Sequence, residues 1–138
     1  MKDSVVVTIP SHPKYLSVVR AATVKMGKIY GMDDPVIEDV KLAVDEACSN
    51  VIKHAYKGDT SKKIVVKYKT TQNYFKVVIE DGGIKSQMEL MKGRSLDDIR
   101  PGGLGIHFIR RVFDVFKFDE RKKNGNRLIL IKYMKGNG

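Results

Sequence analysis

The sequence predicts an α/β (α+β) two-layer sandwich, with three helices on one face of a mixed, mostly antiparallel sheet. Five short segments alternate apolar and polar residues, as strands with one buried face do. Four of these segments form pairs joined by short polar turns, so hairpins and antiparallel pairing dominate. Three longer segments repeat apolar residues at intervals of three and four, which indicates helices that bury one side against the sheet.

The length of the chain limits the number of domains. Its 138 residues, 42% of them hydrophobic, suffice for one sizeable core and leave little room for a second. No repeat, low-complexity tract or linker divides the sequence, so we expect a single domain over residues 1–138. No apolar stretch approaches the ~20 residues of a membrane span, and the first apolar run is too short for a signal peptide.

Charge and cysteine content narrow the setting and the partners. Lysine and arginine outnumber aspartate and glutamate by 26 to 16, and the net charge of +10 should attract nucleotides, nucleic acids or acidic protein surfaces. The charge alone does not choose among these. Cys48 is the single cysteine, which excludes an internal disulfide and a multi-cysteine zinc site. Its apolar helical surroundings predict a buried thiol in a reducing cytoplasm.

One strand and one helix are predicted in the first 31 residues. Apolar residues alternate up to Pro10, which has no amide donor and ends the strand. A helix opens near Pro13, and Gly27 with Gly31 marks its end. The apolar stripe of this helix consists of Leu16, Val19, Thr23 and Met26.

A second helix and a hairpin follow. Asp34 and Pro35 start the helix, and Gly58 lets the chain turn after its end. Two alternating segments at 64–70 and 74–80 are joined by three polar residues, which predicts an antiparallel pair.

The last third of the chain begins with a long irregular segment. Residues 84–101 show no sustained periodicity and predict a loop or lid with one short helical turn, and such loops are often functional. A third helix follows from Gly102. A hairpin over 116–120 and 127–134, with Asn-Gly at 124–125, completes the predicted sheet.

Three polar residues in the second helix form the first candidate site. Glu46, Asn50 and His54 are four residues apart, so they share one face beside the apolar stripe. A carboxylate there can accept a proton, and the amide oxygen of Asn50 suits Mg²⁺, which keeps several waters beside substrate phosphates. The row fits metal-assisted phosphoryl transfer. Taken alone, Glu46 and Asn50 are more simply solvated helix positions, and His54 is a structural histidine without a catalytic role.

A strand end and a glycine-rich helix start supply two further candidates. Asp81 follows an apolar strand and precedes Gly82 and Gly83. An enclosed aspartate can accept a hydrogen bond from an exocyclic amine such as that of adenine, while glycine lets the base approach the backbone. Residues 102–105 lead into the third helix, whose free N–H groups and dipole favour phosphate. Taken singly, the Asp81 segment could also be a simple Asp-Gly turn. The glycine-rich segment at 102–105 matches neither a Rossmann fingerprint nor a P-loop.

Taken in order, these three motifs resemble the N, G1 and G2 boxes of the GHKL ATPases, which include type II topoisomerases, mismatch-repair ATPases and histidine kinases. The resemblance covers nearly the whole chain, because the predicted order of elements is that of the family's Bergerat fold. Within the superfamily, DEACSNVIKHAY and GGLGIHFIRRVFD look like the N and G2 boxes of anti-sigma-factor serine/threonine kinases of the RsbW and SpoIIAB type.

The resemblance implies a role for each matched residue. Glu46 would be the general base that activates a serine or threonine hydroxyl of a partner, and Asn50 would hold Mg²⁺ beside ATP or ADP. Asp81 would bind the adenine amine, and Gly83 would leave room for the base. The residues against the phosphates would be Gly102, Gly103, Leu104 and Gly105.

Two positions depart from the family pattern. Lys85 stands where the G1 box would have its last glycine, and Asn126 follows Gly125 where many relatives have threonine. Lys85 could stiffen the loop or contact the nucleotide, so it bears on closure of the ATP lid expected at 84–101. Neither change removes the base or the metal ligand, and phosphoryl transfer needs positioning and charge neutralisation above all.

By resemblance, the chain would be a cytoplasmic, ATP-dependent anti-sigma factor. It would sequester a sigma factor and phosphorylate an anti-sigma-factor antagonist of the STAS type on serine or threonine. Family members are usually homodimers, and the N-terminal strand and first helix would be the meeting surface. Arg20 on that helix is a candidate partner contact, with a solvated helix charge as the alternative interpretation.

Two other functions remain open at this point. One is a nucleotide-sensing module that sequesters its partner without phosphorylating it, although the retained Glu46 argues against this. The other is a nucleic-acid-binding domain built on a basic hairpin. Tyr68 and Tyr74 on that hairpin are more simply sheet residues than stacking platforms for bases. The basic residues concerned are Lys62, Lys63, Lys67 and Lys69.

Overall fold

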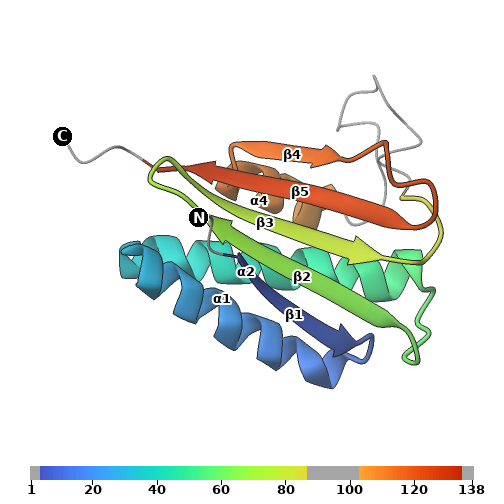
Figure 1. Ribbon diagram of the computed structural model, residues 1–138. Helices are drawn as coiled ribbons and strands as arrows, with labels where there is room; N and C mark the ends of the chain where they lie inside the picture. Colours follow the sequence, from blue (N-terminus) through green and yellow to red (C-terminus); the bar gives the residue numbers. More distant parts are fainter. Residues whose placement is uncertain (1–3, 87–102, 135–138) are drawn as a thin grey trace.

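The computed structural model describes residues 4–86 and 103–134, which form two layers (Figure 1). One layer is a five-stranded sheet, and three α-helices cover one of its faces. The strands are β1 (Ser4–Pro10), β2 (Lys63–Thr70), β3 (Tyr74–Asp81), β4 (Val115–Phe118) and β5 (Asn126–Tyr133). The helices are α1 (Leu16–Tyr30), α2 (Asp34–Asn50) and α4 (Gly103–Val112). The predicted two-layer fold class is therefore confirmed.

The order of strands in the sheet is β1-β2-β3-β5-β4. All four pairings between the described strands are antiparallel, so the parallel component expected of a mixed sheet does not occur there. The reason is the place of β5. It lies between β3 and β4, which run in the same direction, and pairs with both.

Alternation along the strands places two polar residues on the core side of the sheet. Phe75, Val77 and Ile79 of β3 are buried against the helices, and Asp81 is the next inward position. Its partner across the β3–β5 ladder is Asn126, which is also buried. The end of the apolar core is thus closed by a carboxylate and a carboxamide.

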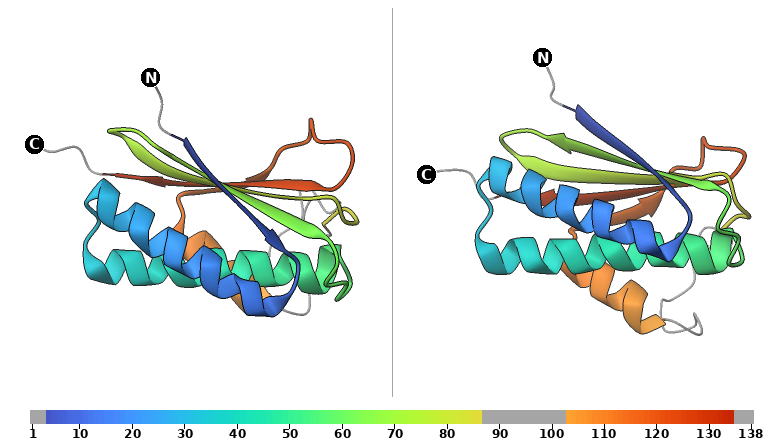
Figure 2. Two further views of the ribbon diagram at one scale, coloured as in Figure 1. Left: turned by 60° about the horizontal axis from the view of Figure 1, so that its bottom comes forward. Right: turned by 90° about the horizontal axis from the view of Figure 1, so that it is seen from below.

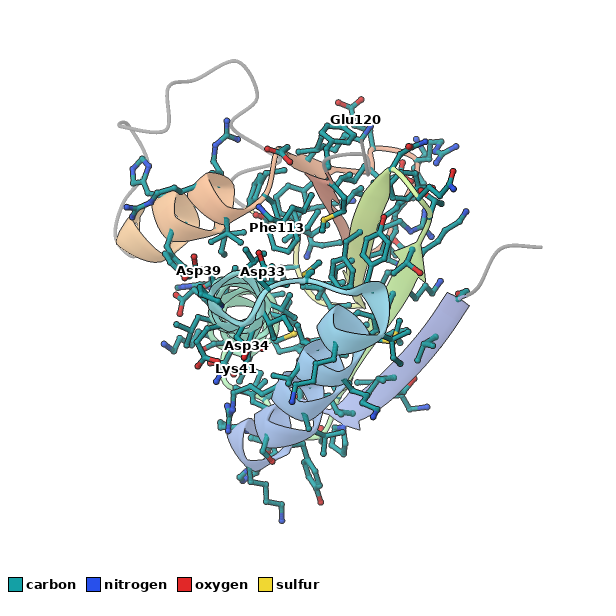
Figure 3. The ribbon with its side chains drawn as sticks, turned by 90° about the vertical axis from the view of Figure 1, so that its left-hand side faces the viewer. Asp33, Asp34, Asp39, Lys41, Phe113 and Glu120 are labelled. Carbon is teal, nitrogen blue, oxygen red and sulfur yellow. The ribbon has the colours of Figure 1, made fainter. Side chains whose placement is uncertain are left out.

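The central helix of the second layer is α2, which packs against α1 on one side and α4 on the other (Figure 2). A short 3₁₀ helix, η1 (Pro13–Tyr15), precedes α1, and a π-helical turn, η2 (Val51–Ala55), continues α2. None of the described helices is both long and apolar enough to span a membrane. Phe113, which follows α4, is buried between that helix and the sheet (Figure 3).

Of the two glycines predicted to mark the end of the first helix, one does so and the other does not. Gly31 ends α1 in the left-handed conformation, with φ of 86°, as a C-terminal glycine should. Gly27 does not end the helix and lies inside it, buried against α2. A Cβ there would lie 2.8 Å from Cγ1 of Ile37, so glycine serves the close approach of the two helices.

The predicted buried thiol is confirmed. Cys48 lies on the core side of α2 and is fully buried. Burial, with a smaller contribution from the charge of Asp45, raises the pKa of the thiol to about 12. Cys48 therefore stays protonated at neutral pH and serves as an apolar core residue.

A buried hydrogen bond links the two layers and gives a test of the fold. The Oη of Tyr68 on β2 lies 2.7 Å from Oγ1 of Thr23 on α1, whose hydroxyl donates to the carbonyl of Val19. Tyr68→Phe should lower the free energy of unfolding by about 1 kcal/mol, because the bond is lost while the core volume is kept. Urea unfolding measures this. Tyr133→Phe, at a side chain 58% exposed, is the control and should change nothing; equal stability of the two variants would contradict the expectation.

Candidate functional site

Two polar side chains on one face of α2 are available to a ligand. Glu46 and Asn50 are half-buried, and neither makes a hydrogen bond or ion pair with any other described residue. The neighbouring Asp45 points elsewhere and accepts a hydrogen bond from Nη1 of Arg20 on α1, at 2.8 Å. His54 is exposed and has no hydrogen bond in the same part of the chain, so the structural role expected for it is not found.

The start of α4 lies directly against Glu46. A Cβ on Gly105 would lie 2.8 Å from Cδ of Glu46 and closer still to Oε1, so a larger residue there would displace the Glu46 side chain. Gly103 and Leu104 form the first turn of the same helix. Gly102 lies outside the described residues. The first and third predicted motifs are therefore brought together by the packing of α4 on α2.

The turn after β3 lies against the C-terminal end of the central helix. A Cβ on Gly83 would lie 2.6 Å from the carbonyl carbon of Ala55 in η2, with the carbonyl oxygen closer still. Ile84 donates its backbone N–H to the same carbonyl at 2.9 Å. Carbonyls near a helix end lack partners within the helix, and Ala55 obtains one from this turn. The second predicted motif thus meets the first through the π-helical turn.

Asp81 is held in one orientation at the end of β3. Its carboxylate is buried, with 5% of the residue exposed, and Oδ1 accepts hydrogen bonds from the Gly83 amide at 2.8 Å and from Nδ2 of Asn126 at 3.0 Å. Both bonds end on Oδ1, which leaves Oδ2 without a donor among the described residues. Burial raises the pKa of Asp81, while the bonds from Gly83 and Asn126 oppose that rise.

Three residues without a settled role in the sequence prediction contribute hydrogen bonds to this part of the site. The hydroxyl of Tyr56 donates to the carbonyl of Lys63 and accepts the Gly82 amide, which fixes the turn after Asp81. Nζ of Lys85 donates to the carbonyl of Lys122 at 2.6 Å. Of the two roles considered for Lys85, this contact favours stiffening of the loop.

The third residue, Asn126, begins β5 on its inward face, and the β3–β5 pairing sets it opposite Asp81. Asn126 was predicted in the turn before that strand, and Tyr56 only as a residue after the second helix, so neither contact was predicted.

The predicted ATP lid lies largely beyond what the structure describes. Of residues 84–101, the described part is 84–86, and the short helical turn expected there falls within 87–101. The lid stays a prediction.

The described site offers oxygen atoms and no preformed metal cluster. No group of three or more His, Cys, Asp or Glu side chains within residues 4–86 and 103–134 could hold an ion. A cation at Asn50 would therefore take most of its ligands from a substrate or from water, as Mg²⁺ commonly does.

The basic hairpin lacks the exposed aromatic side chain that a nucleic-acid-binding surface would use for stacking at Tyr68. Lys63, Lys67 and Lys69 lie on the face of β2 away from the helices, and Nζ of Lys67 pairs with Glu80 at 2.6 Å. Tyr68 points the other way and is fully buried, so it cannot stack on a base. These contacts argue against the nucleic-acid interpretation.

Two adjacent glycines give a matched test of the turn after β3. Gly83→Ala should lower the free energy of unfolding by roughly 1–3 kcal/mol, because the new methyl group meets the backbone of Ala55. Gly82→Ala should stay within about 0.5 kcal/mol of the wild type, since nothing lies within 4 Å of its Cβ position. Chemical denaturation of both variants provides the measurement. A tolerated Gly83→Ala would show that the turn does not need this contact.

Known proteins resemble the chain in sequence and in structure. It matches the family of histidine kinase-like ATPase domains over residues 9–132. It is 31% identical to the serine-protein kinase RsbW of Listeria innocua, over 97% of this chain and 89% of the relative. Identity to the serine-protein kinase RsbW of Bacillus subtilis is 25%, over 97% and 88%. The crystal structure of the RsbU and RsbW domains of a Mycobacterium tuberculosis protein has a TM-score of 0.68 at 16% identity, over 98% of this chain and 34% of that one, which shows a shared fold.

Proposed function

The chain belongs to the family of histidine kinase-like ATPase domains, and we propose that it is an ATP-dependent serine/threonine-protein kinase that acts as an anti-sigma factor. Relatives over nearly its whole length are named serine-protein kinases. The observation that carries the proposal is the place of Glu46. Its carboxylate lies against Gly105 at the start of α4, one helical turn before Asn50 and on the helix whose end holds the Asp81 turn.

The described residues fit ATP. Asp81 keeps Oδ2 as an acceptor for the amine of adenine. Gly83, whose missing Cβ would point at the backbone of Ala55, is assigned to the base pocket on sequence alone. The N-terminus of α4, entered through Gly103, Leu104 and Gly105, offers N–H groups and the positive end of the helix dipole to the phosphates. Gly102 is assigned to the same phosphate site on sequence alone.

In the proposed phosphoryl transfer, Glu46 and Asn50 have different roles. We assign Glu46 as the general base, which accepts the proton of a serine or threonine hydroxyl as that oxygen attacks the terminal phosphorus and the bond to ADP breaks. Asn50 is assigned as the protein ligand of Mg²⁺ through its amide oxygen. Bound Mg·ATP supplies the phosphoryl group and neutralises its charge. The lid assigned to residues 84–101 would exclude water from the transfer.

The partners follow from the same proposal. A sigma factor would be sequestered, and a STAS-type antagonist would accept the phosphate, both in the cytoplasm where ATP and transcription are found. A groove between α1 and α2 supports a partner contact at Arg20, because Arg20, Lys25, Lys28 and Lys41 line it and would attract an acidic surface. Arg20 is 40% exposed despite its pairing with Asp45.

A homodimer is proposed through β1 and α1. Val5 and Val6 of the edge strand β1 and Val18 of α1 are exposed by 41%, 55% and 46%. An edge strand with exposed valines readily pairs with another chain, which supports a meeting surface at this place.

Phosphate transfer to an antagonist protein tests the kinase. With Mg·ATP, Glu46→Gln should lower the rate of transfer by about 10²-fold or more, because the base is lost, while nucleotide affinity stays within about twofold. Glu38→Gln, at an exposed position of the same helix, is the control and should retain transfer. If the wild type binds ATP and transfers no phosphate, the chain is a nucleotide-sensing module instead.

Asp81→Asn should separate stability from binding. ATP affinity should fall by about 10- to 100-fold, since an amide nitrogen would face the adenine amine.

The raised pKa of Asp81 disfavours the ionised form in the folded state, so wild-type stability falls as pH rises through that pKa. Asp81→Asn should remove this fall and match or exceed the wild type at pH 7. Calorimetry and urea unfolding between about pH 4 and 7 measure both effects, and unchanged ATP affinity would refute the assignment.

A further inference from the structure

We propose that Leu42 on α2 is the docking contact for the phosphoacceptor protein, and that it selects a serine or threonine with an apolar side chain about two residues away. The inference deepens the proposed function and rests on it. Leu42 needs no contact with the nucleotide or with the reacting atoms. It determines which protein segment is held against Glu46.

Leu42 is the exposed large apolar side chain of α2, a helix that the structure describes throughout. Its exposed fraction is 46%, whereas Ile37, Val40 and Val44 of the same helix are buried. The helical period explains the difference, because the buried residues face the sheet while Leu42 faces away from it. Single exposed leucines are common on protein surfaces, so the position of Leu42 must supply the reason for a function.

Leu42 lies beside Glu46 on the solvent side of α2. The two residues are four apart in sequence, which separates them by about 40° around the helix axis and about 6 Å along it. Asn50 lies one turn from Glu46 in the other direction and is assigned to Mg²⁺, and Gly105 of α4 lies against Glu46. The solvent side of α2 toward its N-terminus is left for the segment that brings a hydroxyl to Glu46, and Leu42 lies in its first turn.

The spacing along the helix sets which residue of the acceptor meets Leu42. An extended segment advances about 3.3 Å per residue, so about 6 Å corresponds to about two residues. Side chains two positions apart in such a segment point to the same face. The acceptor hydroxyl and the side chain two positions away therefore both face α2, one at Glu46 and the other at Leu42.

Charged residues surround Leu42 and form a polar rim. The residues three and four positions from it on either side are Glu38, Asp39, Asp45 and Glu46. Nζ of Lys41 pairs with Glu38 at 2.5 Å. Nη1 of Arg20 pairs with Asp45 at 2.8 Å. Two of the charges beside Leu42 are thus paired within the chain, and an apolar anchor inside such a rim is the contact that gains most from the exclusion of water.

The occupant of this surface is the acceptor protein, and the sigma factor is the alternative that the test must exclude. Transfer requires a hydroxyl within hydrogen-bond reach of Glu46, and Leu42 lies one helical turn from that carboxylate. Sequestration of a sigma factor has no such requirement. An apolar contact at Leu42 therefore serves the protein that gives up its hydroxyl proton.

Steady-state transfer of phosphate from Mg·ATP tests the proposal, with the antagonist protein that the wild-type chain phosphorylates as the probe. Leu42→Ala should raise the KM for this antagonist roughly fivefold or more, because apolar contact area is lost. The kcat and the affinity for ATP should each stay within about twofold, because Glu46 and the nucleotide site are intact. Leu42→Met keeps an apolar side chain of similar volume and should keep the KM within about twofold of wild type.

Ile29→Ala is the matched control. It also removes exposed aliphatic surface, at a side chain of α1 that is 67% exposed, and it should leave the KM unchanged. A double-mutant cycle tests the contact itself. It combines Leu42→Ala with alanine at the apolar residue about two positions from the phosphorylated serine or threonine of the antagonist, and the double variant should be little worse than either single one.

A wild-type KM in Leu42→Ala, or independent effects of the two changes in the cycle, would overturn the inference while leaving the kinase intact. Weaker binding of the sigma factor by Leu42→Ala, with transfer unchanged, would overturn it too and assign this surface to the sigma factor. A wild type that binds ATP and transfers no phosphate would instead overturn the proposed function, and the inference with it.

Discussion

The candidate site depends on two glycines that let other elements touch the central helix. Gly105 brings the start of α4 against Glu46, and Gly83 brings the end of β3 against Ala55. At Gly83 a Cβ would overlap the backbone of Ala55, and at Gly105 it would overlap the side-chain carboxylate of Glu46. Packing that is this close converts three motifs, spread over some 60 residues between Glu46 and Gly105, into one site. The central helix α2 with its π-helical turn is the common support.

A second property of the candidate site is that it contains a buried carboxylate, that of Asp81 at the end of β3. Asp81 ends a buried strand, and Asn126 ends the strand beside it, so the inward alternation of the sheet finishes in a carboxylate held by a carboxamide. Burial works against ionisation of Asp81, and the donors from Gly83 and Asn126 offset part of that cost. Ionisation of Asp81 therefore lowers the stability of the folded state, and under the proposed function the same carboxylate is the acceptor for the base. Such a compromise is common at functional sites.

Periodicity in the sequence was enough to predict the five strands and three α-helices found in residues 4–86 and 103–134, and their arrangement in two layers. It could not identify Gly27 as a packing residue, because the reason is Ile37 on another helix. The π-helical turn at Val51–Ala55 was also missed, since its sequence continues the helical pattern. The motifs located Glu46, Asn50, Asp81 and Gly105. The parts played by Tyr56 and Asn126 depend on hydrogen bonds between strands and loops, which only the folded chain reveals.

A crystal structure of the chain with Mg²⁺ and a non-hydrolysable ATP analogue would test the proposed nucleotide site most directly. We expect that the adenine amine donates to Oδ2 of Asp81, that Asn50 holds the cation through its amide oxygen, and that the carboxylate of Glu46 faces the terminal phosphate. An analogue seated away from Asp81, for example in the cationic groove between α1 and α2, would contradict it.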